Sequence, residues 1–368
     1  MKIVISSNTS WSIYNFRLNL ARNLSKNGYK VILVAPRDKY SEILEKEFDY
    51  YDVFMNNKGT NPIEDFKTII SYYRLYKDIK PNIVLNFTIK PNIYGTIACS
   101  WLKIKTINNI AGLGYLFVHQ NLVTIIAKKL YKYSQKKANK IFFQNREDYK
   151  TFTTQKLVDI EKCDILPGSG VDVNKFTSSN KEKEDNIFRF LLIARMIWDK
   201  GIDEFVEAAK IVKKSYSNVE FLLLGETNVD NPNSIPIEQI KKWEKEEIIK
   251  YLGSSDNVKE EIEKVDCIVL PSYYREGTPR VLLEASSMEK PVITTNNVGC
   301  RDVVEDKVTG YICEIKNPKH LAKKMIKILN LTDLQRNEMG KKGREKIIQE
   351  FDEKIVIDKY LNTIKDNI

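Results

Sequence analysis

Residues 271–285 read Pro-Ser-Tyr-Tyr-Arg-Glu-Gly-Thr-Pro-Arg-Val-Leu-Leu-Glu-Ala and connect two different kinds of segment. The apolar run Cys267–Leu270 before them predicts a buried parallel strand, and Pro279–Ser287 predicts a helix with a proline in its first turn. A strand, a glycine-containing loop and a helix start direct backbone N–H groups and the positive end of a helix dipole at one point. Such a point is suited to bind a phosphate.

Two carboxylates flank this loop. Glu276 directly precedes Gly277, and Glu284 lies about one turn into the predicted helix, so both are within reach of one ligand. The alternative is that both are solvated surface charges, the usual position of a glutamate.

The same residues resemble a known signature. Glu276 and Glu284 are separated by seven residues, with Gly277 and Pro279 between them, which is similar to the donor-binding motif of glycosyltransferase family 4, retaining enzymes of GT-B fold. The resemblance implies that Glu276 lies against the donor sugar and that Glu284 hydrogen-bonds the nucleotide ribose. It also assigns the remaining donor contacts to Gly253, Ser254, Gly277, Thr278, Pro279 and Val281.

Length and composition set the broad class. A chain of 368 residues exceeds the usual size of a single core, so two domains are expected. With 42% hydrophobic and 29% charged residues the chain is an ordinary globular protein, and its apolar runs are too short to span a membrane. The first residues predict a strand rather than a secretory signal, and five scattered cysteines indicate reduced thiols in a cytoplasmic protein.

The net charge of +10 requires an explanation. An excess of Lys and Arg serves nucleic acid, an anionic membrane surface or phosphorylated small molecules, or it is a general property of a solvated surface.

The N-terminal half begins with a strand–helix–strand unit: Lys2–Ser6, Phe16–Lys26 and Val31–Ala35, with Asn8–Ile13 as a polar loop. Ile83–Phe87 predicts a further strand, and the sequence around Lys90–Gly95 and Ile110–Tyr115 resembles bacterial enzymes that build polysaccharides on lipid carriers. We expect the acceptor-binding residues in this half: Asn15, Arg17, Lys90, Asn92, Gly112, Gly114 and His119.

Asn121–Lys140 predicts a basic amphipathic helix without acidic residues. Its apolar positions are Leu122, Ile125, Ile126, Leu130 and Tyr133, and its lysines include Lys128, Lys129, Lys132 and Lys136. Such a helix lies on a membrane surface or contacts a lipid diphosphate. In the alternative interpretation its apolar stripe faces the core. Nucleic-acid binding is the third interpretation, and no recognisable motif accompanies the lysines.

A second strand–helix series starts at Phe188–Ile193 and leads through Arg195 and Lys200 to a predicted helix at Ile202–Lys213. Two cations at the carboxyl end of a strand form a plausible diphosphate clamp, or they are ordinary surface charges. Together with the Glu276 loop they match the family's Arg and Lys motif. The resemblance implies that Arg195 and Lys200 neutralise the departing nucleoside diphosphate in place of a metal, and that no cofactor is needed.

The resulting prediction is an α/β protein of GT-B type with two Rossmann-like domains facing a cleft. The N-terminal acceptor domain is placed at residues 1–166, the linker at 167–186 and the donor domain at 187–351, with a helix at about 352–368 packing back on the first domain. The predicted activity is retaining transfer of a hexose or HexNAc from a UDP-sugar to a saccharide on undecaprenyl diphosphate. The predicted location is cytoplasmic, on the inner face of the bacterial membrane. The alternatives are a GT-B nucleotide-sugar epimerase and a non-catalytic, basic nucleotide- or nucleic-acid-binding protein.

Overall fold

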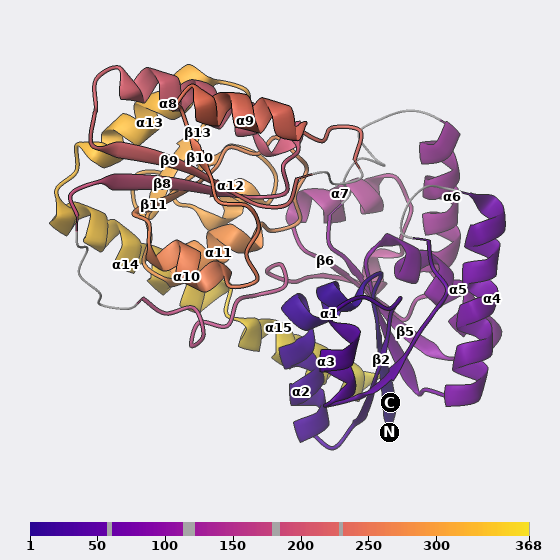
Figure 1. The fold of residues 1–368 in the computed structure, drawn as a ribbon. Coiled ribbons are helices and arrows are strands. Elements are labelled where there is room, and N and C mark those ends of the chain that lie inside the picture. The colour runs from indigo at the N-terminus through magenta and orange to yellow at the C-terminus, as the bar shows by residue number, and fades with distance from the viewer. Residues whose placement is uncertain (57–60, 113–121, 179–184, 228–230, 368) are drawn as a thin grey trace. The chain divides into compact units, whose positions relative to one another are not determined.

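The computed structural model describes the chain except for residues 57–60, 113–121, 179–184, 228–230 and 368, and for residues 122–124 it describes the backbone only. The chain forms two compact units (Figure 1). The first unit comprises residues 1–169 and 354–368, and the second comprises residues 170–353.

The first unit contains a parallel seven-stranded sheet of order β3-β2-β1-β4-β5-β6-β7. Its strands are β1 (Lys2–Ser6), β2 (Lys30–Val34), β3 (Asp49–Tyr51), β4 (Ile83–Phe87), β5 (Lys105–Ile110), β6 (Lys140–Phe143) and β7 (Cys163–Ile165). Its helices are α1 (Ser10–Phe16), α2 (Leu18–Lys26), α3 (Ser41–Glu45), α4 (Pro62–Ile79), α5 (Thr96–Trp101), α6 (Leu122–Lys137), α7 (Arg146–Thr154) and α15 (Glu353–Asp366). Pro91–Gly95 forms a single π-helical turn before α5.

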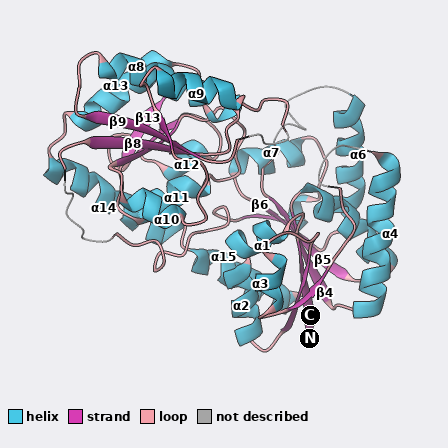
Figure 2. Ribbon diagram, in the orientation of Figure 1, coloured by secondary structure: helices cyan, strands magenta, loops and turns pink. Residues whose placement is uncertain are grey.

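The second unit contains a parallel six-stranded sheet of order β10-β9-β8-β11-β12-β13. Its strands are β8 (Phe188–Ile193), β9 (Val219–Leu224), β10 (Lys250–Tyr251), β11 (Cys267–Leu270), β12 (Val292–Thr295) and β13 (Gly310–Cys313). Its helices are α8 (Ile202–Lys213), α9 (Ile237–Lys245), α10 (Val258–Glu263), α11 (Arg280–Ser287), α12 (Cys300–Val303), α13 (Pro318–Leu329) and α14 (Asp333–Glu350). Helices flank the strands within each unit (Figure 2), as the alternating strand and helix patterns predict.

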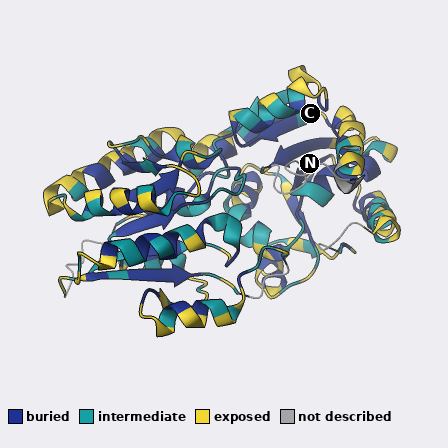
Figure 3. Cartoon of the chain, turned by 90° about the horizontal axis from the view of Figure 1, so that it is seen from above, coloured by how far each residue is buried: buried dark blue, intermediate teal, exposed yellow. Residues whose placement is uncertain are grey.

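Hydrophobic clusters lie on both faces of each sheet because parallel strands are covered on both sides. Alternate residues of β1 belong to different clusters: Val4 packs in one and Ile3 and Ile5 in the other. Figure 3 shows the consequence, with the central strands largely buried and the helices exposed along their outer faces, whereas the edge strands β3, β7 and β10 are only partly buried or exposed. This confirms the predicted fold class.

Local sequence explains where the structure departs from the predictions at the N-terminus. The polar segment Asn8–Ile13 is not a loop throughout, because α1 begins at Ser10. Thr9 caps this helix: its side-chain oxygen accepts a hydrogen bond from the backbone N–H of Ser12. The helix expected over Phe16–Lys26 is divided at Arg17 into α1 and α2.

The segment expected as a linker at 167–186 starts in the first unit, which continues to Ser169, and the second unit begins at Gly170. Val171, Val173 and Phe176 are buried in a core cluster of that unit. Arg344 of α14 holds the segment by donating to the carbonyl oxygens of Val173 and Phe176, each at 3.1 Å. The chain then returns through α15, where Tyr360 and Ile364 are buried in the core of the first unit.

Candidate active site at the carboxyl ends of β8 and β11

Lys200 and Glu276, which lie far apart in the sequence, form an ion pair in the second unit. Lys200 ends a short 3-10 turn after β8, and Glu276 lies in the loop after β11, the neighbouring strand. Each side chain is 13% exposed, so the pair is largely removed from water. Ser272 also donates from Oγ to Glu276 Oε1 at 3.1 Å, which leaves the carboxylate with two donors.

Backbone hydrogen bonds hold these two loops together. The carbonyl oxygen of Asp199 accepts from the backbone N–H groups of Tyr273 at 3.0 Å and Tyr274 at 2.9 Å. Asn233 Nδ2 in turn donates to Asp199 Oδ2 at 2.7 Å. The position of Lys200 relative to Glu276 is therefore fixed by the main chain on both sides of the pair.

Two glycines allow main chains to approach where any side chain would collide. A Cβ at Gly201 would stand 2.1 Å from the carbonyl oxygen of Pro271, and a Cβ at Gly299 would stand 2.1 Å from that of Gly277. Both glycines also have positive φ, 75° and 77°, which favours glycine independently of the space. The loop that carries Glu276 is thus held between the loop after β8 and the start of α12.

Glu284 lies in α11 and is 9% exposed. Arg280 Nε donates to Glu284 Oε1 at 2.9 Å within the same helix. Burial raises the pKa of Glu284, while the charges of Arg280 and Lys175 and the hydrogen bond from Arg280 act in the opposite direction. The buried carboxyl therefore depends on nearby cations for its negative charge.

The remaining predicted donor-binding residues also lie at the carboxyl edge of this sheet or at the start of α11. Arg195 is exposed in the loop directly after β8, and its side chain forms no ion pair or hydrogen bond with the described residues. The loop after β10 contains Gly253, with φ of 73°, and the exposed Ser254. The segment that leads from Glu276 into α11 contains Gly277, Thr278, Pro279 and Val281.

The acceptor residues were predicted in the first unit, and the two that lie at its π-helical turn are bonded internally. Lys90 pairs with Asp65 of α4 at 2.7 Å, with side chains 15% and 14% exposed. Asn92 is buried in the π-helical turn and donates from Nδ2 to the carbonyl oxygen of Asn109 at 2.7 Å. The structure thus uses both side chains to hold the turn in place.

Two further acceptor candidates lie at the end of α1: Asn15 in its last turn and Arg17 between α1 and α2. Asn15 donates from Nδ2 to the carbonyl oxygen of Trp11 at 3.0 Å. Arg17 is buried, with its guanidinium carbon 4.2 Å from the centre of the Phe87 ring. Gly112 has φ of 124°, and Gly114 and His119 lie outside the described residues.

The apolar stripe predicted for α6 does not face the core as a unit, although Leu130 packs against a core cluster of the first unit. Its buried positions are Tyr131, Ser134 and Gln135, whereas Ile125, Ile126 and Tyr133 are each about half exposed, at 51%, 50% and 49%. The lysines on its exposed surface are Lys129, Lys132, Lys136 and Lys137, and Lys128 is half-buried. Apolar and cationic side chains therefore share the outer surface of α6.

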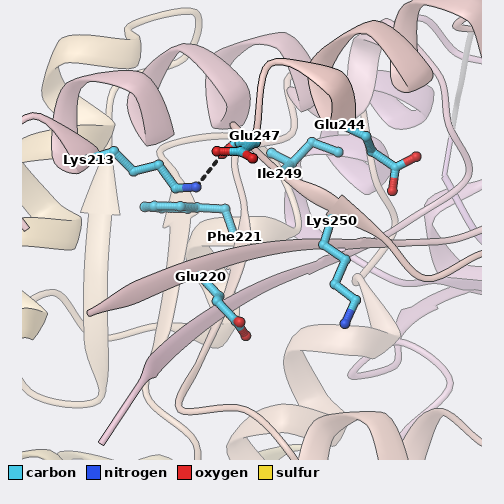
Figure 4. A pocket seen from close by; sticks show the side chains of 7 residues that line it. All are labelled: Lys213, Glu220, Phe221, Glu244, Glu247, Ile249 and Lys250. Carbon is cyan, nitrogen blue, oxygen red and sulfur yellow. Dashed lines mark hydrogen bonds between the residues drawn. The ribbon is translucent and has the colours of Figure 1, made fainter. Parts of the chain in front are cut away.

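A separate pocket of about 310 Å³ lies near the amino-terminal ends of β9 and β10 (Figure 4). Lys213 Nζ donates to the carbonyl oxygen of Glu247 at 2.5 Å, and Glu244 Oε1 accepts from the backbone N–H of Tyr251 at 2.8 Å. Several of its polar groups are thus already bonded within the protein, and ligands of open α/β sheets bind at the carboxyl ends instead. The candidate active site is therefore the opposite edge of the sheet.

The geometry explains which residues sequence reasoning missed. Ser272 and Arg280 stand in the segment 271–285, but their i,i+4 contacts with Glu276 and Glu284 were not predicted. Asn233 lies in a segment with no recognised signal, and only its long-range bond to Asp199 connects it to the site. The chemical result is a carboxylate, a paired lysine, an exposed arginine and a helix start at one sheet edge, which is suited to bind an anionic, hydroxyl-rich ligand. Among the described residues no three or more His, Cys, Asp and Glu side chains gather as a metal site would require.

Two parallel α/β units with a charged site at the carboxyl edge of the second define a protein of GT-B class. Comparisons with known proteins agree. The family model for Glycosyl transferase 4-like proteins matches residues 2–145, and that for Glycosyl transferases group 1 matches residues 173–346. The chain belongs to the GT-B glycosyltransferases and is an enzyme of that family.

Relatives and solved structures cover the whole chain. The chain is 28% identical to the N,N'-diacetylbacillosaminyl-diphospho-undecaprenol alpha-1,3-N-acetylgalactosaminyltransferase of Campylobacter jejuni, over 98% of this chain and 97% of that protein. It is 26% identical to the UDP-Gal:alpha-D-GlcNAc-diphosphoundecaprenol alpha-1,3-galactosyltransferase of Escherichia coli, over 83% and 79%. Its fold is similar to that of Anabaena HepE in complex with UDP and glucose, with a TM-score of 0.82, 16% identity and 99% of each chain covered.

Within the described residues, no helix combines the length and the apolar character that crossing a bilayer demands.

Proposed function

We propose that this glycosyltransferase moves a hexose or HexNAc from a UDP-sugar, with retention of anomeric configuration, to a saccharide carried on undecaprenyl diphosphate. The names of the Campylobacter and Escherichia relatives support the acceptor class, because both act on diphosphoundecaprenol-linked sugars. The Escherichia relative's UDP-linked donor supports the nucleotide.

The observation that carries the proposal is the Lys200–Glu276 pair. A lysine and a glutamate shielded from water at the carboxyl ends of adjacent strands provide opposite charges at one point. Electrostatic groups that are held in place before reaction, in a site with little water, stabilise developing charge more effectively than they would in bulk solvent.

Each charge has a distinct role in the transfer. Lys200 and Arg195 stabilise the negative charge that develops on the departing UDP, which gives the protein its own source of positive charge for this step. Lys200 has three N–H donors, so its ammonium group can contact a phosphate oxygen and Glu276 together. Glu276 positions the donor sugar, and Glu284 accepts hydrogen bonds from the ribose.

The outer surface of α6 supports peripheral binding to an anionic membrane. Exposed Ile125, Ile126 and Tyr133 beside exposed lysines match an interfacial helix, in which apolar groups enter the headgroup region and cations contact anionic lipids. This location would bring the enzyme to a lipid-linked acceptor.

The experiment is a transfer assay with purified protein, UDP-sugars and an undecaprenyl-diphosphate-linked saccharide, with and without chelator. Release of UDP that requires the acceptor, retention in the product and activity that persists with chelator support the proposal. An inverted product or a requirement for added divalent metal contradicts the mechanism.

A further inference from the structure

Arg280 occupies a position where helix energetics disfavours a cation. It is the first residue of α11, at the positive end of the helix dipole. It also pairs with Glu284 in the order cation then anion at i,i+4, which is the less stabilising of the two orders. The stability of α11 therefore does not explain why an arginine stands there.

The surroundings of Glu284 provide an explanation. The carboxyl is buried, and Arg280 Nε contacts its Oε1 at 2.9 Å, with the two side chains 18% and 12% exposed. Lys175, in the segment that Arg344 fixes through the carbonyl oxygens of Val173 and Phe176, adds a second positive charge that acts on Glu284.

We propose that Arg280, assisted by Lys175, is a positioning residue that keeps the buried carboxyl of Glu284 ionised and aimed, so that donor affinity stays constant across neutral pH. The inference rests on the proposed function, which gives Glu284 the ribose of the donor. Arg280 acts through Glu284 and does not itself contact the donor.

Other ionisable groups lie on the elements that pack against α11, including Arg301 and Asp302 of α12. From α14, the Arg344 guanidinium is bonded to the backbone carbonyls of Val173, Phe176 and Ser287. From α12, Cys300 is a buried thiol whose pKa is raised by burial to about 12, so it stays neutral. Strand β12 contains no ionisable residue, and in β11 burial raises the pKa of the Cys267 thiol.

The consequence of losing Arg280 has a defined direction. Removing a cation in contact with a carboxylate raises its pKa by about 1–3 units, in addition to the upward shift that burial already causes. Protonated Glu284 is a weaker acceptor for ribose hydroxyls. Donor affinity should then be normal at high pH and fall as the pH decreases through the new pKa.

The test measures UDP binding by calorimetry from pH 6 to pH 8.5, taking the ratio of variant to wild-type affinity so that titration of UDP itself cancels. We expect the UDP affinity of Arg280→Gln to lie within about threefold of the wild-type affinity at pH 8.5 and to be at least about tenfold weaker than it at pH 6. Arg280→Lys, which restores the charge, should return the ratio to a nearly pH-independent value. Lys342→Gln removes a 2.9 Å i,i+4 pair with Glu338 in α14 and serves as the matched control, with no change expected.

A double-mutant cycle separates positioning from direct contact. In a Glu284→Gln background, Arg280→Gln should cost no further affinity at any pH, because the titrating carboxyl is absent. A further loss in that background, or an Arg280→Gln ratio that does not change with pH, would overturn the inference while leaving the proposed function intact. A wild-type protein that binds no UDP at any pH would remove both.

Discussion

Replacing Gly299 by alanine tests how closely the loops of the active site depend on one another. The new Cβ would stand 2.1 Å from the carbonyl oxygen of Gly277 and 3.0 Å from that of Glu276. Ordinary contact begins near 3.4 Å, so the Glu276 loop must move by about 1 Å, and a misplacement of this size costs about 10²-fold in rate. The positive-φ backbone of Gly299, with φ of 77° and ψ of −37°, adds about 1–3 kcal/mol to the loss of stability on substitution, and the overpacking adds about 1–3 kcal/mol.

The assay is the rate of sugar transfer together with thermal unfolding of the same preparations. Gly28→Ala is the matched control, because Gly28 has a similar φ of 83° but no atom within 4 Å of the point that its Cβ would occupy. We expect Gly28→Ala to lose about 1–2 kcal/mol of stability and no activity. A Gly299→Ala protein that transfers sugar at the wild-type rate would refute the view that this contact positions Glu276.

Three other predictions concern the remaining elements. Glu276→Ala should abolish transfer while the far-ultraviolet circular dichroism of the protein stays unchanged; a folded, active variant contradicts the site. Changing four lysines of α6 to Glu should reduce binding to anionic liposomes at least about tenfold; the four are Lys128, Lys129, Lys132 and Lys136. The same charge reversal at four lysines elsewhere should have a much smaller effect on liposome binding; these are Lys241, Lys242, Lys245 and Lys264. Tyr360→Phe should lower stability by about 1–3 kcal/mol in denaturant melts, because it leaves buried Asn109 Nδ2 without its 2.9 Å partner. Tyr216→Phe, which loses an exposed bond to Asn330, should cost less; equal costs would argue against a role for burial.

The sequence predicted the second unit more closely than the first. Strand β8 and helix α8 were predicted with the bounds that the structure has, because their apolar patterns are bounded by clear loop residues. The Glu276 loop and its helix were recognised because the motif is local, with all its residues between a strand and a helix start.

The contacts that complete the site could not be derived from local patterns. The Lys200–Glu276 pair, the bonds to the Asp199 carbonyl and the approach of Gly299 to Gly277 all join segments far apart in the chain. Lys90 was predicted to contact the acceptor from its place in the Lys90–Gly95 segment, and its pairing with Asp65 of α4 was not predicted because the two lie 25 residues apart. The apolar pattern of α6 left its buried face open; in the structure polar Ser134 and Gln135 are buried while apolar Ile125 and Ile126 are exposed, the reverse of usual patterning.

The buried polar residues beneath the π-helical turn account for that reversal. Gln135 Nε2 donates to the carbonyl oxygen of Asn92 at 3.0 Å, and Asn108 Nδ2 donates to Gln135 Oε1 at 2.8 Å. Paired in this way, amide side chains can be buried without leaving their hydrogen-bonding groups unsatisfied. The inner face of α6 is therefore polar at these positions, and hydrophobic patterning alone does not reveal it.

The most direct measurement for the central claim is acceptor-dependent release of nucleoside diphosphate by the wild-type protein and by Lys200→Ala. We predict release of UDP from one UDP-sugar only when a lipid-diphosphate saccharide is present, and a decrease of about 10²–10³-fold in Lys200→Ala. Release that is independent of the acceptor, or a Lys200→Ala enzyme as fast as the wild type, would contradict the account.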